Sequence, residues 1–259
     1  MSVVGSVESL RRYPVKSMRG ESLTEAFVGF AGVYGDRLFA FASSARPKGF
    51  PYLTGREQQE MILYRPTFRH PQLAGAPPNL AEAEAIEPGV TPVVADPADL
   101  AVDVETTSGQ TLSVDDPALR ELLDIGEDLT LVRSDRALTD CRPVSLFALQ
   151  TARQLAGELG RPIDERRFRA NIYADMPEQD GFGEDAFLDR RLRIGSKLIL
   201  TVVERDPRCA MISMDPDTAE REPAVLRQVA QAHDGNAGVY GVVLAEGSVR
   251  PGDEIELLD

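Results

Sequence analysis

Residues 191–211 read RLRIGSKLILTVVERDPRCAM and contain two short predicted strands joined by a tight turn. The strands are predicted over Arg191–Ile194 and Lys197–Glu204, because both runs are rich in apolar and β-branched residues and a Gly-Ser pair separates them. A second turn, Arg250-Pro251-Gly252-Asp253, precedes a predicted strand over Glu254–Leu258. Turns that lead into a terminal strand in this way are typical of small β-barrels.

Other short runs of this kind make the sequence rich in strands, and 21 Gly and 18 Pro among 259 residues supply turns. Two helices are also predicted. The first has Ser145 as its cap and an apolar face from Leu146 to Leu159, and the second spans Glu222–Ala232. The pattern predicts an α+β fold that is mostly β. The remaining strands are predicted at Ser2–Val7, Leu38–Ala42, Met61–Tyr64, Leu100–Glu105, Leu129–Arg133, Phe168–Ala174 and Val239–Ala245.

The chain carries 42 acidic and 28 basic residues, a net charge of −14. This charge excludes a generic nucleic-acid binder, because such proteins present a basic surface to phosphates. Residues 76–128 hold 13 acidic side chains and one basic side chain, whereas residues 1–75 hold six acidic and ten basic ones. We interpret residues 76–92, which are rich in Ala, Pro and Glu, as a solvated loop or linker. An anionic small-molecule ligand is compatible with the more basic N-terminal part.

The N-terminus lacks the apolar core of a signal peptide, and no segment approaches 18 uninterrupted apolar residues. The sequence therefore predicts a soluble, cytoplasmic protein with no membrane partner. Two cysteines exclude a disulfide framework, a four-thiolate zinc site and an iron–sulfur cluster. His70 and His233 are far apart in the sequence and give little support to a zinc enzyme or a Ser-His-Asp hydrolase.

Cys209 is a candidate nucleophile or metal ligand. It directly follows a predicted strand and is next to Arg208, whose guanidinium would favour the reactive thiolate. On this signal alone, a small buried hydrophobic residue is the simpler interpretation. Cys141 has similar neighbours but precedes a predicted helix, so we expect it to be structural.

Basic residues recur in turns beside hydroxyl and amide side chains. Lys offers a point charge, Arg a planar fork, and Ser and Asn orienting hydrogen bonds, so the blocks predict a site for a phosphorylated or otherwise anionic ligand. Each block taken singly also fits a scattered surface cation. The blocks are Tyr13–Gly20 with Lys16 and Ser17, Gly35-Asp36-Arg37, Thr54-Gly55-Arg56, and Phe168–Asn171 with Arg169 and Asn171.

In their order along the chain, these blocks resemble the MOSC domain proteins that carry an N-terminal β-barrel partner domain. That family includes the mitochondrial amidoxime-reducing components and the C-terminal part of molybdenum cofactor sulfurases. The resemblance covers almost the whole chain, and its specificity comes from many separated segments in one order. The segments are YPVKSMRG, GDRLFAF, LTGREQ, PVSLFAL, RFRANIYAD followed by FGEDAF, RLRIGSKLIL, DPRCAMISMDPDT and GVYGVVLAEGSVRPGDEIELL.

The resemblance implies a MOSC-type β-barrel, similar to the pyruvate kinase β-barrel, and an N-terminal β-barrel lobe with a cofactor in the cleft between them. We expect residues 1–130 in the N-terminal lobe and residues 131–259 in the MOSC domain. The resemblance implies that Cys209 ligates molybdenum or, in a sulfurase-like role, accepts sulfur. Arg208 and Asp206 would support the thiolate, and Asp215 would lie near the open face of the metal. The implied molybdopterin-binding residues are Lys16, Ser17, Arg37, Arg56, Ser145, Arg169 and Asn171.

The expected function is a molybdenum-cofactor-binding oxidoreductase that reduces N-hydroxylated or other N-oxygenated small molecules. Because two cysteines cannot ligate an iron–sulfur cluster, electrons are expected from a separate protein of flavin or ferredoxin type. No pyridoxal phosphate domain of the sulfurase kind is recognised, so pyridoxal phosphate binding is a property of the wider family only. Two alternatives remain open. The chain could be a non-redox carrier of the molybdenum cofactor, or of sulfur as a Cys209 persulfide, or it could keep only the fold.

Overall fold

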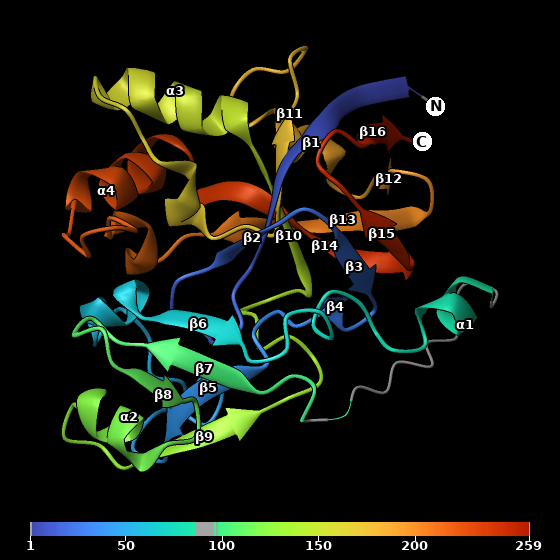
Figure 1. Ribbon diagram of the computed structural model, residues 1–259. Coiled ribbons are helices and arrows are strands. Elements are labelled where there is room, and N and C mark those ends of the chain that lie inside the picture. The colour runs from blue at the N-terminus through green and yellow to red at the C-terminus, as the bar shows by residue number, and fades with distance from the viewer. Residues whose placement is uncertain (1, 86–95, 97, 259) are drawn as a thin grey trace.

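The computed structural model describes residues 2–85, 96 and 98–258, and these form two lobes (Figure 1). The upper lobe in Figure 1 contains the large sheet with α3 and α4 beside it, and the lower lobe contains smaller sheets. The strands of the described part are β1 (Ser2–Arg12), β2 (Glu21–Leu23), β3 (Ala26–Gly29), β4 (Gly32–Val33), β5 (Phe39–Ser43), β6 (Arg65–Phe68), β7 (Val102–Glu105), β8 (Thr111–Ser113), β9 (Leu129–Arg133), β10 (Val144–Ala148), β11 (Ile172–Asp175), β12 (Arg191–Ile194), β13 (Leu198–Pro207), β14 (Asn236–Ala245), β15 (Gly247–Val249) and β16 (Glu254–Leu257). The helices are α1 (Leu80–Ala85), α2 (Pro117–Leu122), α3 (Leu149–Leu159), α4 (Pro223–Ala232) and the short 3₁₀ helices η1 (Gln59–Leu63), η2 (Glu165–Phe168), η3 (Gly183–Phe187) and η4 (Ala210–Ser213).

A closed β-barrel of 7 strands is the central element of the upper lobe. The strand order is β11-β10-β14-β13-β12-β16-β1, and β1 pairs with β11 to close the ring. The predicted hairpin of β12 and β13 lies within this ring in antiparallel register, with Ile194 opposite Leu198. Every second residue at the start of β13 is buried, as expected for a strand whose one face lines a barrel interior. The expected α+β, mostly β barrel fold is therefore confirmed.

The lower lobe has its own apolar core, which includes Phe41, Leu53, Met61 and Leu119. Two antiparallel sheets surround this core, β5-β9 and β6-β7-β8. The segment after β1 reaches this lobe before the chain returns to β2, and the Lys16 amide donates to the carbonyl of Phe39 in β5. As a result, the segment after β1 lies where the two lobes meet.

Most of the predicted strands form, with ends that move by a few residues. Two predictions are wrong or partly wrong. Met61–Tyr64 is the end of η1 and the residue after it, because backbone bonds from Met61 to Gln58 and from Tyr64 to Met61 close 3₁₀ turns. A four-residue apolar run has no periodicity that separates a buried helical turn from a strand.

The predicted strand Phe168–Ala174 is also only partly correct. Its first residue ends η2, whose start is capped by the side chain of Asp164, and Arg169 then turns into the left-handed region. The strand β11 begins only at Ile172. The short elements β2, β3, β4, β6, β8, β10, β15, α1 and α2 were not predicted. Of the predicted loop over residues 76–92, α1 occupies 80–85, and residues 86–92 lie outside the described part.

The predicted helix after Pro143 begins later than expected. Ser145 belongs to β10 and does not cap the helix, since α3 starts at Leu149 and its N-cap residue, Ala148, has no side-chain cap. The fully buried carboxyl group of Glu184 lies at this helix end instead. Both of its oxygens accept from the Thr151 hydroxyl, at 2.9 and 2.8 Å, and Oε1 accepts from the Ala148 amide at 3.4 Å. Glu184 therefore takes the place of a local cap.

Burial raises the pKa of Glu184 above its ordinary value of 4.5, so the folded state favours the neutral carboxyl and loses stability as the pH rises above that value. We expect Glu184→Ala to lower the free energy of unfolding by roughly 2 kcal/mol, because it leaves the buried Thr151 hydroxyl without its acceptor. Glu184→Gln keeps an acceptor and cannot ionise. It should cost less than half as much and should show a smaller decline in stability between pH 4.5 and neutrality. Chemical denaturation at several pH values measures both effects, and equal losses in the two variants would contradict the capping role.

Candidate functional site

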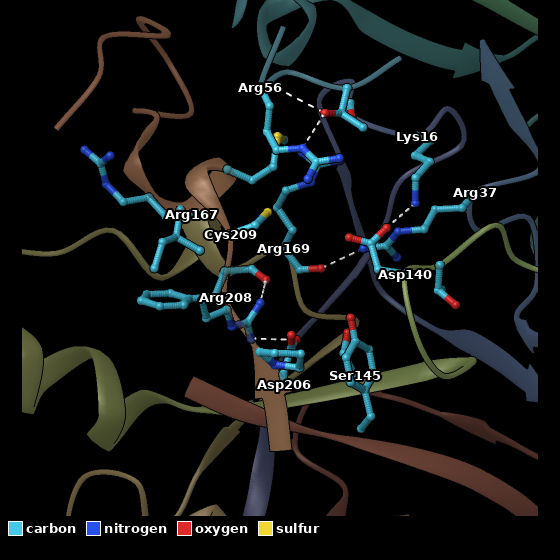
Figure 2. A pocket seen from close by; sticks show the side chains of 18 of the residues that line it. Lys16, Arg37, Arg56, Asp140, Ser145, Arg167, Arg169, Asp206, Arg208 and Cys209 are labelled. Carbon is cyan, nitrogen blue, oxygen red and sulfur yellow. Dashed lines mark hydrogen bonds and ion pairs between the residues drawn. The ribbon is translucent and has the colours of Figure 1, made fainter. Parts of the chain in front are cut away.

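A cleft of about 700 Å³, including its open mouth, lies between the lobes and is lined by residues of both (Figure 2). Its lining includes six cations but only two carboxylates, Asp140 and Asp206, although the whole chain has a net charge of −14. The cleft is therefore strongly basic in an acidic protein. Seven of the eight residues predicted from the sequence line it, namely Lys16, Ser17, Arg37, Arg56, Ser145, Arg169 and Cys209.

Lys16 is held at one wall of the cleft by a residue that the sequence analysis missed. Its Nζ donates to the carbonyl of Leu138 at 2.8 Å and to the carboxylate of Asp140. It also lies 5.3 and 5.2 Å from the ring centroids of Phe50 and Tyr52. Burial lowers the pKa of Lys16, and the Asp140 charge opposes this shift. Because 124 positions separate Lys16 from Asp140, no local pattern connects them.

Arg37 and Arg169 both stack on one aromatic ring. Their guanidinium carbons lie 4.6 and 4.3 Å from the ring centroid of Tyr13, and Arg37 Nη2 donates to the Arg169 carbonyl at 2.9 Å. Burial opposes the charge on Arg37, but the Asp36 carboxylate outweighs it and raises the pKa. Burial lowers the pKa of Arg169, and the charge of Arg37 adds to this effect. Arg169 is thus a half-buried cation that is poorly compensated.

Three of the cleft residues have left-handed backbone conformations, which residues other than Gly rarely adopt. The φ angles are 67° at Ser17, 46° at Arg37 and 54° at Arg169. Surrounding bonds hold these conformations, for example the Arg37 amide to the Tyr13 carbonyl at 2.7 Å. Strain of this kind gathers at functional sites, because the surrounding structure maintains it only where a side chain must point in one direction.

Cys209 is half-buried and follows β13, as predicted, at the start of η4. The adjacent Arg208 side chain is fixed by other groups: Nε donates to the Ala237 carbonyl at 2.6 Å, Nη1 to the Phe168 carbonyl at 2.8 Å, and Nη2 lies 2.7 Å from Asp206 (Figure 2). Gly238 makes room for it, since a Cβ there would lie 3.0 Å from Nη2 and the backbone has a φ of +83°. Among the described residues, the guanidinium therefore donates hydrogen bonds to two carbonyls and forms an ion pair with a carboxylate, and not with the sulfur.

Asp206 is a buried acid at the wall of the cleft. Burial raises its pKa from 3.8 to about 7, against the opposing charge of Arg208 and a hydrogen bond from Tyr240. Burial and the charge of Asp206 also raise the pKa of Tyr240. The cleft thus holds a carboxyl group that exchanges its proton near neutral pH, which is a property of general acids.

Asn171 is the one implied cofactor-binding residue that does not line the cleft. It is only 1% exposed, and its Oδ1 accepts from both the amide and the hydroxyl of Ser145 at 3.2 Å, while its Nδ2 donates to the carbonyl of Arg11 in β1 at 3.3 Å. Asn171 therefore connects three barrel strands behind the site. Asp215, expected near the open face of the metal, is also outside the lining. Its carboxylate accepts a hydrogen bond from Arg167 Nη2 at 3.0 Å.

Several lining residues were not predicted to lie there. Asp140 precedes Cys141, for which a structural role was expected, and Tyr240 lies in a predicted strand for which no site role was assigned. Arg167 stands in the RFRAN block, and its cationic side chain was the available signal. The aromatic and hydroxyl residues carried no signal before the lobes were assembled. Asp206 and Arg208, expected beside the Cys209 thiolate, also line the cleft. The lining residues for which no role was predicted are Phe50, Thr54, Thr139, Asp140, Arg167, Phe168, Pro207, Met211, Ile212 and Tyr240.

The donor set suits a particular kind of cofactor. Within the residues that the structure describes, no group of three or more His, Cys, Asp or Glu side chains is placed to hold a metal ion. The cleft instead combines one thiol, Cys209, with many cations. A metal held there would need most of its ligands from its own organic part, and an anionic group on that part would match the cations. A phosphorylated pterin dithiolene has both features.

Comparison with known proteins gives two matches to family models. The model described as "MOSC N-terminal beta barrel domain" matches residues 4–118, and the model described as "MOSC domain" matches residues 133–256. Both agree with the resemblance found in the sequence. No curated protein matches the sequence. In the part of the chain that is described, no helix combines the length and the apolar character needed to cross a membrane.

Solved structures with similarity to this chain include the YuaD protein from Bacillus subtilis, at 15% identity and a TM-score of 0.48, over 98% of this chain and 94% of that one. YiiM from Geobacillus stearothermophilus is 19% identical with a TM-score of 0.36, over 45% of this chain and 54% of that one. YiiM from Escherichia coli is 16% identical with a TM-score of 0.33, over 46% and 55%. This chain thus spans about half the length of the two YiiM structures.

Because Asp206 has a raised pKa, the folded state favours its protonated form, and its contribution to stability falls as the pH rises from 3.8 through about 7. We expect Asp206→Asn, which cannot ionise, to lack this decline. Subtracting its free energy of unfolding from that of the wild type at each pH isolates the effect from other acids. Parallel curves for the two proteins between pH 4 and pH 8 would show that Asp206 ionises normally.

The left-handed backbone at Arg169 predicts an inverted preference between two substitutions. At most positions Gly is less stable than Ala by about 0.5–1 kcal/mol, but at φ 54° the Cβ of Ala is unfavourable, by about 1 kcal/mol. Both variants lose the stacked guanidinium, so Arg169→Gly should be more stable than Arg169→Ala. In the exposed strand position of Arg65 the order should be the usual one. Denaturation midpoints of the four variants check this, and the same order at both positions would remove the argument from strain.

Proposed function

Because the chain belongs to the family of MOSC domain proteins with an N-terminal MOSC β-barrel domain, we propose that its cleft binds a molybdenum cofactor with Cys209 as the protein's ligand to the metal. The observation that carries the proposal is the combination of one thiol with six cations from both lobes in one cleft. A soft thiolate suits the metal end of such a cofactor, and the cations suit its phosphate.

The residues at the basic wall have distinct parts in the proposal. Lys16, Arg37 and Arg169 neutralise the phosphate, and the ring of Tyr13 fixes the directions of both guanidinium groups. Ser17 and Ser145 offer hydroxyl groups to polar edges of the pterin. Asn171 acts indirectly, because its two bonds from Ser145 fix where that serine lies.

The proposed reaction is the reduction of N-hydroxylated or other N-oxygenated small molecules. For a hydroxylamine, R–NHOH with two electrons and two protons gives R–NH₂ and H₂O. When bound, the cofactor supplies two-electron oxygen-atom chemistry at its metal. The protein supplies the thiolate ligand and, through Asp206, an acid that holds a proton near neutral pH. The electrons come from a separate protein of flavin or ferredoxin type.

The test compares the wild type with Cys209→Ser after expression in a host that makes the cofactor. Serine offers a hard hydroxyl in place of a soft thiolate, so we expect activity towards an N-hydroxylated substrate, with a chemical one-electron donor, to fall at least about a hundredfold. Molybdenum and pterin per chain are measured in parallel. Cys141→Ser is the matched control, because Cys141 is exposed and outside the cleft lining, and it should stay within a few-fold of the wild type.

The outcomes separate the proposal from its alternatives. Stoichiometric molybdenum with activity that depends on Cys209 supports the reductase. A Cys209 persulfide without molybdenum, detected by mass spectrometry, would instead assign a sulfur carrier. Full activity in Cys209→Ser with the cofactor bound would remove the ligand assignment.

A further inference from the structure

A second basic pocket lies beside the cleft, where the end of β1, β2 and η2 come together. It encloses about 540 Å³, including its opening. Four of the nine residues that line it are arginines, and none of the nine carries a carboxylate. In a chain with 42 acidic and 28 basic residues this is a marked local excess of positive charge. The arginines are Arg11, Arg19, Arg166 and Arg169.

Nearby carboxylates compensate only half of this charge. Asp217 is 2.5 Å from both Arg19 Nη2 and Arg166 Nη2, so these two arginines are paired. Within the described residues, Arg11 and Arg169 have no ion-pair partner. The Nε atom of Arg19 is also buried and lacks a hydrogen-bond partner there. A buried donor without a partner is costly, and two half-buried arginines without a carboxylate leave positive charge uncompensated, so the pocket is matched to an external anion.

The lining of the pocket has groups that suit a small oxyanion. The Tyr13 ring packs directly against Gly20, where a Cβ would lie 2.4 Å from a ring carbon, so a glycine is needed at this point of the lining. Ser22 adds a hydroxyl group to the lining. Guanidinium forks with a hydroxyl donor are the groups with which proteins recognise phosphate.

We propose that this pocket binds a phosphate-type oxyanion, with Arg11 as its free cation and Ser22 as a supporting donor. The anion is either inorganic phosphate or the phosphate group of a small ester. The proposal does not depend on the function of the cleft, because neither Arg11 nor Ser22 lines the cleft.

Arg169 gives the pocket a physical connection to the cleft. It is the one residue among the described lining residues that both cavities share. Its Nη2 donates to the Met18 carbonyl at 2.8 Å, so it is held in place beside both. A bound anion in the second pocket offsets part of the positive charge of Arg169, and therefore lowers the positive potential of the cleft without entering it.

The test is a titration of the full chain without cofactor, labelled with ¹⁵N, with inorganic phosphate at pH 7. The backbone amide of Ser22 reports the second pocket, and that of Cys209 reports the cleft. We expect a saturable shift at Ser22. Arg11→Ala should raise the dissociation constant obtained from Ser22 by about 10- to 100-fold. The constant obtained from Cys209 should stay within twofold of the wild-type value. Arg11→Lys keeps the charge but not the planar guanidinium, so it should raise the dissociation constant obtained from Ser22 less than Arg11→Ala does.

Arg65→Ala is the matched control, because Arg65 is an exposed arginine on β6 outside both cavities and should bind as the wild type does. A parallel titration with adenosine monophosphate distinguishes the sources. If adenosine monophosphate binds at least tenfold more tightly than inorganic phosphate, the ligand is a phosphate ester. If it binds equally or more weakly, the ligand is the free anion. No saturable shift at Ser22 with either ligand, or an unchanged constant in a folded Arg11→Ala variant, would overturn the proposal.

Discussion

The double pairing of β1 is the constraint on which the rest of the structure depends. This first strand pairs with β16 along its early residues and with β11 along its later ones, and so closes the barrel (Figure 1). A bulge between Val7 and Ser9 in the pairing with β11 gives the local bend that closure needs. Because β1 ends at the rim, Tyr13 to Gly20 leave the barrel at the boundary between the lobes. The Asn171 bond to the Arg11 carbonyl then fixes β11 and the Arg169 turn beside that segment.

This arrangement explains why cations from distant segments meet. Lys16 follows β1, Arg37 precedes β5, and Arg169 precedes β11, and all three lie within one boundary between two apolar cores. Burial there penalises each charge, and the structure offsets it unevenly. Asp36 pairs with Arg37 and Asp140 with Lys16, whereas the described partners of the Arg169 side chain are a carbonyl and an aromatic ring. The remaining charge, together with three strained backbone conformations, is what a site for an anionic ligand requires.

The sequence was informative where function depends on residue type and less so where it depends on assembly. The Gly-Ser turn and the β-branched run after it predicted the β12–β13 hairpin, and the order of the blocks predicted the barrel and seven lining residues. Ser145 shows the limit of local rules: a Ser before an apolar run predicts a cap, but a buried carboxyl 39 positions later in the chain, Glu184, takes that role. Asn171 was expected to contact the ligand, but its side-chain amide connects barrel strands behind the cleft.

The two carboxylates of the cleft, Asp140 and Asp206, have pKa values shifted in opposite directions. Asp140 lies against Lys16 and keeps a lowered pKa, whereas burial dominates at Asp206 and raises its pKa to about 7. An anion in the cleft adds negative charge near both. It competes with Asp140 for Lys16, and it makes the ionised form of Asp206 still less favourable. In the proposed function, binding of an anion in the cleft and proton uptake by Asp206 would therefore be thermodynamically linked, and each would favour the other.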